Sequence, residues 1–150
     1  LAYKMITQPK FPSFGWLLDM GATALWENFM KPETKWVDSR NHQFWGDVSH
    51  WFHRWLAGID YFAPEKRLNI APQFVDGIDF ADGSFKANEG EIRVLWKKED
   101  ENIRLEVSAP DDLNGFIRLP MNYTFKDEEL GIGTSVKKLE SGNYAVIKYK

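Results

Sequence analysis

The hydrophobic residues of this chain follow a helical period first and a two-residue period later. In the helical stretch they recur every three or four positions, at Phe44, Val48, Trp51, Phe52, Trp55, Leu56 and Ile59. This spacing predicts a helix from roughly His42 to Ala57, which Gly58 is suited to cap at its C-terminal end. A shorter helix is predicted to begin near Ser13, whose hydroxyl can accept a hydrogen bond from the first turn, and to end at Gly21.

The later part of the chain alternates apolar and polar residues. Short runs show this pattern, and clusters of Gly, Asp and Asn separate them: Ile92–Trp96, Ile103–Val107, Phe116–Leu119 and Tyr144–Tyr149. Such runs predict the antiparallel strands of a β-sandwich or jelly roll. The period changes around Pro64, so we divide the chain into helices at residues 1–63 and a sandwich at residues 64–150.

The tryptophans concentrate in the helical part. Six of the seven lie there: Trp16, Trp26, Trp36, Trp45, Trp51 and Trp55. A few short helices with so many aromatic side chains would expose a large apolar surface, which normally packs against something. The chain also opens at Leu1 without an initiator Met. We therefore expect the helices to pack against an upstream part of a longer polypeptide, and we do not expect this stretch to fold well alone.

Composition disfavours several classes of protein. The net charge of −3 and the pI near 5.6 argue against nucleic acid as a partner, because phosphate binding needs a basic face. The absence of cysteine excludes disulfides, thiolate metal sites and a cysteine nucleophile, and it leaves the compartment open. The sequence has no apolar run of about 18 residues, so no membrane span is expected.

The candidate chemistry lies in a segment of small residues after the first helix. There Glu27 follows Trp26, and sugar-processing sites combine a carboxylate for proton transfer with an aromatic face for a pyranose ring. Trp36, in a long loop over residues 30–41, is a second candidate platform. The alternatives are a solvated or ion-paired Glu27, a Trp26 that packs in the core, and a Trp36 that serves as a surface anchor.

Two motifs and their spacing resemble the end of the catalytic domain of the bacterial α-L-rhamnosidases. The motifs are Gly21-Ala22-Thr23-Ala24-Leu25-Trp26-Glu27 and, after a loop, Ser39-Arg40-Asn41-His42 with Gly46. Three further stretches are similar to the end of that domain and to the family's C-terminal sandwich: Trp55-Leu56-Ala57-Gly58-Ile59, Gly90-Glu91-Ile92-Arg93-Val94-Leu95-Trp96 and Leu139-Glu140-Ser141-Gly142-Asn143-Tyr144. The resemblance covers almost the whole chain.

The resemblance implies an inverting glycoside hydrolase built on an (α/α)6 barrel. This chain would hold the last helices of the barrel and the antiparallel, jelly-roll-like β-sandwich that follows. Glu27 falls on the family's general base, and His42 falls on a histidine that contacts the rhamnose ring. The family's general acid lies upstream, so this stretch would hold about half of an active site and be inactive alone. The implied substrate is a rhamnose-containing glycan or glycoside, with no cofactor and no metal.

Some positions depart from the family pattern. Ala24 stands where a second Thr is common, Phe29 where a second Trp is common, and Gln43 where an aromatic residue is common. These departures put the fine substrate preference in doubt more than the reaction class. Two other interpretations stay open: another (α/α)-barrel glycosidase or lyase with a different sugar in its subsite, and a non-catalytic carbohydrate-binding or structural β-sandwich module.

The other histidines do not indicate a metal site. His53 lies on a different face of the predicted helix from Asp47 and His50, and no thiolate is available. Core positions are expected for the tryptophans on the helical stripe and in the strand: Trp51, Trp55 and Trp96.

Overall fold

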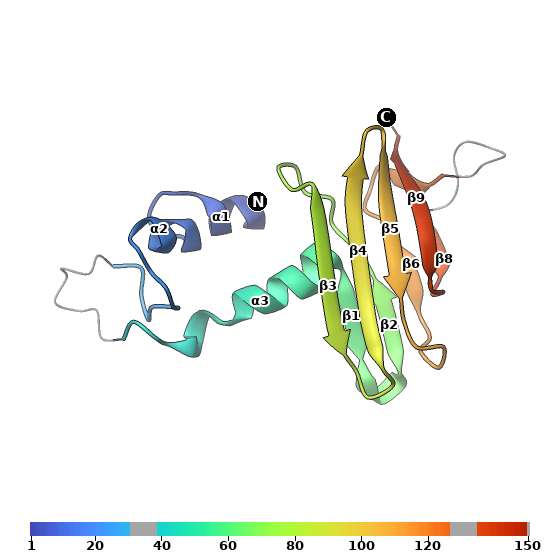
Figure 1. Cartoon of the computed structure of the whole chain (residues 1–150), viewed down its shortest axis with the longest axis horizontal. Helices are drawn as coiled ribbons and strands as arrows, with labels where there is room; N and C mark the ends of the chain where they lie inside the picture. Colours follow the sequence, from blue (N-terminus) through green and yellow to red (C-terminus); the bar gives the residue numbers. More distant parts are fainter. Residues whose placement is uncertain (31–38, 127–134, 150) are drawn as a thin grey trace. The chain divides into compact units, whose positions relative to one another are not determined.

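The computed structural model describes residues 1–30, 39–126 and 135–149 (Figure 1). The chain forms two compact units, Leu1–His50 and Trp51–Lys150. The regular elements described in the first unit are helices, joined by irregular segments, and the second unit contains the β-sheets. The predicted domain boundary between residues 63 and 64 is not tested by this division into compact units and stays a prediction.

The first unit begins with two short helices, α1 (Ala2–Thr7) and α2 (Phe14–Asp19). As predicted, Ser13 caps α2, because its hydroxyl oxygen accepts the backbone N–H of Trp16 at 2.9 Å. Gly21 follows α2 with a φ of +81°, a left-handed conformation that glycine adopts without strain. The segment from Ala22 to Met30 then has no regular secondary structure.

Residues 43–57 are helical, as the hydrophobic period predicts, but they form three kinds of helix. They are the 3-10 helix η1 (Gln43–Trp45), the α-helix α3 (Asp47–Trp51) and the π-helix η2 (Phe52–Ala57). The predicted cap is confirmed: Gly58 has a φ of 85°, and its N–H donates a hydrogen bond to the carbonyl of His53. The prediction of one continuous α-helix is therefore right in the extent of the helical stretch and wrong in the type of helix.

The apolar stripe of this helical stretch is buried only at its end. Leu56, Ala57 and Ile59 join the core of the second unit, and Trp51 packs against it. Trp55 is 52% exposed, so its expected core position is wrong. In the π-helix η2 the hydrogen bonds span five residues, so the spacing of three and four residues that predicted the stripe does not define one face there.

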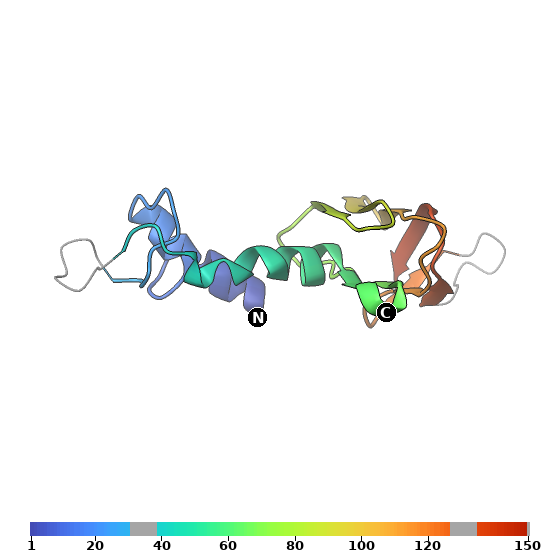
Figure 2. The ribbon, with the colours of Figure 1, turned by 90° about the horizontal axis from the view of Figure 1, so that it is seen from below.

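The second unit is a sandwich of two sheets (Figures 1 and 2). The four-stranded sheet has the order β1-β2-β6-β8, and the five-stranded sheet has the order β3-β4-β5-β9-β7. The elements are β1 (Ile59–Phe62), η3 (Ala63–Glu65), β2 (Arg67–Ile70), β3 (Phe80–Lys86), β4 (Glu91–Glu99), β5 (Asn102–Ser108), β6 (Phe116–Arg118), β7 (Tyr123–Phe125), β8 (Val136–Lys138) and β9 (Gly142–Lys148).

The predicted strands are all present as β4, β5, β6 and β9, and the remaining strands were not predicted. The pairings are antiparallel except between β2 and β6, which run parallel where Ile70 pairs with Ile117. β3 escaped prediction because Asp82 and Gly83 interrupt its apolar pattern. Gly83 is needed there, since a Cβ atom would lie 2.7 Å from the Cβ of Ala57.

Alternating residues of both sheets fill the core. The side chains least exposed to solvent come from both layers: Leu68, Ile70, Ile92, Val94, Trp96, Leu105, Ile117, Phe125 and Val146. As predicted, Trp96 is fully buried, and its indole N–H donates to the carbonyl of Leu56 at 2.8 Å. Leu56 lies in the last turn of η2, where carbonyls lack partners within the helix. This bond therefore ties the helix end to the centre of β4.

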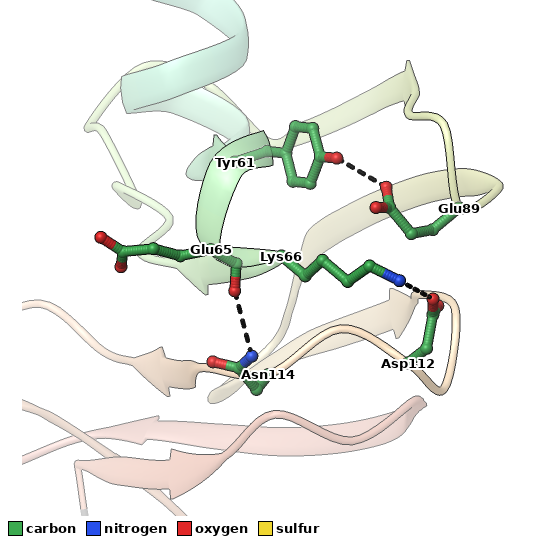
Figure 3. Close-up of polar contacts among 6 residues, drawn as sticks. All are labelled: Tyr61, Glu65, Lys66, Glu89, Asp112 and Asn114. Carbon is green, nitrogen blue, oxygen red and sulfur yellow. Dashed lines mark hydrogen bonds and ion pairs between the residues drawn. The ribbon is translucent and has the colours of Figure 1, made fainter.

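Polar side chains tie the turn after β1 to two loops of the sandwich (Figure 3). Tyr61 of β1 donates its hydroxyl hydrogen to Glu89, in the β3–β4 hairpin, at 2.5 Å. Lys66 pairs with Asp112 at 2.8 Å, and the Asn114 side chain donates to the Glu65 carbonyl at 3.3 Å. The hydrogen bond to Glu89 is the main cause that raises the pKa of Tyr61 to about 12.

No helix in the described part of the chain is long and apolar enough to cross a membrane.

Trp96→Phe tests the contribution of the buried indole. The phenyl ring keeps an aromatic group in the core but is smaller than the indole and deprives the buried Leu56 carbonyl of its close donor. We therefore expect the void and the lost hydrogen bond together to lower the free energy of unfolding by at least about 1–3 kcal/mol. Urea unfolding followed by circular dichroism measures it. The same change at the exposed Trp55 is the matched control and should cost less than about 0.5 kcal/mol. Equal losses at the two positions would contradict this account.

Tyr61→Phe tests the bond to Glu89 through its pH dependence. Since the pKa of Tyr61 is raised from 10.0 to about 12, the stabilisation from this bond is complete below pH 10 and is lost as the pH rises through about 12. We expect the difference in melting temperature between wild type and Tyr61→Phe to be constant below pH 10 and to shrink above it. Tyr149→Phe, at an exposed position, should show no such trend.

Candidate active site

The segment that carries Glu27 is held against the residues that follow the loop. The N–H of Glu27 donates to the carbonyl of Ser39 at 2.9 Å, and the N–H of His42 donates to the carbonyl of Leu25 at 2.7 Å. These two bonds bring the halves of the sequence motif together, although residues 31–38 lie outside the described part of the chain. The site is therefore built from two irregular segments rather than from helices or strands.

A tryptophan side chain forms a hydrogen bond with the second peptide group of Glu27. The indole N–H of Trp45 donates to the carbonyl of Glu27 at 3.0 Å. The ring centroid of Trp45 lies 5.3 Å from that of Phe29, whose own carbonyl accepts the indole N–H of Trp16 at 3.0 Å. Both peptide groups of Glu27 are thus hydrogen-bonded, and its side chain is half-buried.

His42 lies at the start of η1 with one ring nitrogen already engaged. Its Nδ1 accepts the backbone N–H of Phe44 at 3.1 Å, so the neutral ring carries its proton on Nε2. His42 lines an open hollow of about 680 Å³ together with Ala24, Leu25, Asn41 and Gln43. A hydrogen-bond donor at the wall of a polar hollow is suited to bind a hydroxyl group.

Of the two candidate stacking platforms, the structure describes Trp26 but not Trp36. Trp26 is 4% exposed, and the guanidinium carbon of Arg40 lies 5.5 Å from the centroid of its ring. A sugar would have to displace Arg40 to reach that ring, and the platform role of Trp26 stays a prediction. Trp36 lies outside the described residues.

Sequence reasoning singled out Glu27 and His42 but gave no role to Trp45 or Arg40. The signal was available for Trp45: it lies next to Phe44 yet is absent from the apolar stripe, so its ring must face a different neighbour. No signal indicated that Arg40 would cover Trp26. In the described ranges, no group of three or more His, Cys, Asp or Glu side chains is placed to hold a metal ion.

The chain matches two family models in succession. Residues 1–56 match the bacterial alpha-L-rhamnosidase 6 hairpin glycosidase domain, and residues 62–129 match the bacterial alpha-L-rhamnosidase C-terminal domain. The chain belongs to the bacterial α-L-rhamnosidase family. The family assignment confirms the resemblance of the two motifs and the predicted fold class: the end of a helical glycosidase domain followed by a β-sandwich.

Curated proteins that are similar to this chain are named α-L-rhamnosidases. An α-L-rhamnosidase of Alteromonas sp. (strain LOR) is 26% identical over 96% of the chain, and one of Streptomyces avermitilis is 26% identical over 82%. The chain spans only 17% and 13% of the lengths of these proteins.

Solved structures give the same picture. The α-L-rhamnosidase from Dictyoglumus thermophilum superposes with a TM-score of 0.81 and 26% identity, over 99% of this chain and 18% of that one. The Streptomyces avermitilis α-L-rhamnosidase complexed with L-rhamnose has a TM-score of 0.79 at 24% identity, over 98% of this chain and 16% of that one, which supports the fold.

Proposed function

We propose that the complete protein containing this chain is an α-L-rhamnosidase that hydrolyses terminal α-L-rhamnose from glycosides with inversion. Family membership supports the reaction class. The observation that carries the residue assignment is the half-buried Glu27, whose backbone is hydrogen-bonded on both sides and which follows Leu25, a residue that lines the same hollow as His42. A catalytic carboxylate has to be held in this way to meet its substrate in a fixed orientation.

Glu27 is assigned as the general base. In its ionised form it removes a proton from a water molecule while the water oxygen bonds to the anomeric carbon of rhamnose. A general acid on an upstream part of the protein donates a proton to the glycosidic oxygen as its bond to that carbon breaks. The two carboxyl groups would stand about 6.5–9.5 Å apart so that the water fits between them and the sugar.

His42 is assigned to substrate binding. Because its Nδ1 is occupied by the N–H of Phe44, its Nε2–H is the group that can donate to a ring hydroxyl of rhamnose. Trp26 and Trp36 are proposed as aromatic surfaces of the same subsite. Residues 1–63 would then form the catalytic part, and the sandwich at residues 64–150 would support it.

Glu27→Gln in the complete protein tests the base. The amide has the shape of the carboxylate but cannot accept the proton, so we expect kcat on an aryl α-L-rhamnoside to fall by about 100-fold or more, with the fold retained. Glu101→Gln, at an exposed turn, is the matched control and should leave kcat unchanged. Proton NMR of the first-formed anomer tests inversion in the same assay.

The Glu27→Gln experiment also distinguishes the other possible functions from the proposed one. Near-wild-type turnover of Glu27→Gln would move the base to another residue. A wild type that ignores rhamnosides but cleaves other aryl glycosides would indicate a different barrel glycosidase. Sugar binding without turnover would indicate a binding module.

His42→Ala tests the binding role. Loss of one neutral hydrogen bond to a hydroxyl is worth about 0.5–1.5 kcal/mol, so we expect kcat/KM for the aryl rhamnoside to fall by about 2- to 10-fold. His50→Ala, at an exposed position of α3, serves as the control. Unchanged KM and kcat in His42→Ala would remove the assignment.

A further inference from the structure

We propose that Trp45 is a positioning residue that sets the direction of the Glu27 side chain. This inference rests on the proposed role of Glu27 as the general base. The bond that Trp45 makes to Glu27 ends on the main-chain carbonyl and not on the carboxylate. It acts through the main chain, because its indole N–H donates to the carbonyl of Glu27 at 3.0 Å.

The Glu27 backbone depends on this bond because nothing regular surrounds it. Its segment, residues 22–30, has no helix and no strand, and among the described residues Leu25 and Glu27 make its backbone hydrogen bonds to residues 39–42. The bond to Ser39 orients the peptide group before Glu27, and the bond from Trp45 orients the peptide group after it. Together they restrict both backbone dihedral angles of Glu27, and those angles determine where its Cβ atom points.

The indole is itself held in one orientation. The ring of Trp45 packs at a tilt against Phe29, at 5.3 Å between centroids, and edge-on against Phe44, also at 5.3 Å. Trp45 is half-buried and ends the 3-10 helix η1. A donor on a packed ring in a helical element is better fixed than a donor on a free loop, which is what a carboxylate with a narrow geometric task requires.

Trp16 offers a matched control in the same unit. Its indole N–H donates to the carbonyl of Phe29, also at 3.0 Å, so it makes the same kind of bond two residues further along the same segment. Removing either indole N–H costs one hydrogen bond of equal type and length. Of these two indole bonds, only the one from Trp45 is accepted by Glu27, the proposed general base.

The test is a double-mutant cycle in the complete protein, with an activated aryl α-L-rhamnoside as substrate. Trp45→Phe removes the donor and keeps an aromatic ring. We expect kcat to fall by about 10- to 100-fold while KM changes by less than about 2-fold, since misplacement of a catalytic group lowers the rate more than binding. Trp16→Phe should leave kcat within about 3-fold of wild type.

The cycle separates positioning from general support of the fold. If Trp45 acts through Glu27, then Trp45→Phe has no further effect on kcat in a Glu27→Gln background. A multiplicative loss in that background, an equal loss in Trp16→Phe, or unchanged kcat in Trp45→Phe would each overturn the inference. Full activity of Glu27→Gln itself would overturn the proposed base and this inference with it, whereas an inactive Glu27→Gln beside a normal Trp45→Phe would overturn the inference alone.

A second variant covers the case in which Trp45→Phe does not fold. Trp45→benzothienylalanine keeps the bicyclic ring and replaces the indole N–H with sulfur. The packing against Phe29 is then retained and only the bond to the Glu27 carbonyl is lost. The same fall in kcat at constant KM is expected, and wild-type kcat would overturn the inference.

Discussion

The hydrogen bond from the indole of Trp96 to the carbonyl of Leu56 is the constraint on which the second unit depends. It satisfies a carbonyl that the π-helix leaves open at its end, and it does so with the largest side chain of the sandwich core. The helix end therefore cannot shift without opening the core at β4. Two glycines allow close packing around the helix end: a Cβ atom at Gly58 would lie 2.2 Å from the backbone nitrogen of Pro72, and one at Gly83 would lie 2.7 Å from the Cβ of Ala57.

Hydrogen bonds from an indole N–H to a main-chain carbonyl also occur in the first unit, where they hold an irregular segment. Indole N–H groups of Trp16 and Trp45 also donate to main-chain carbonyls, here in a segment with no regular secondary structure. Irregular backbone next to an active site needs partners for its polar groups, and a tryptophan supplies a donor together with a large packing surface. The abundance of tryptophan in this chain is thus explained partly by hydrogen bonding and not only by burial.

The strands show which local signals are reliable. β4 and β5 were predictable because each alternates apolar and polar residues over a long run, and that alternation is written in neighbouring positions. β8 has three exposed residues and β3 contains Gly83, so neither has an apolar pattern of its own. Both are strands because a neighbouring strand supplies their hydrogen bonds, β4 for β3 and β6 for β8.

The sequence by itself determined the family motifs around Glu27 and His42, the extent of the helical stretch, the caps at Ser13 and Gly58, and the change from helix to sandwich. Each depends on residues close together in the chain, where backbone preference and side-chain period act directly. The tertiary structure alone decided that Arg40 covers Trp26 and that Trp45 reaches the Glu27 carbonyl, 18 residues away. Such contacts follow from how distant segments pack, and no local preference encodes them.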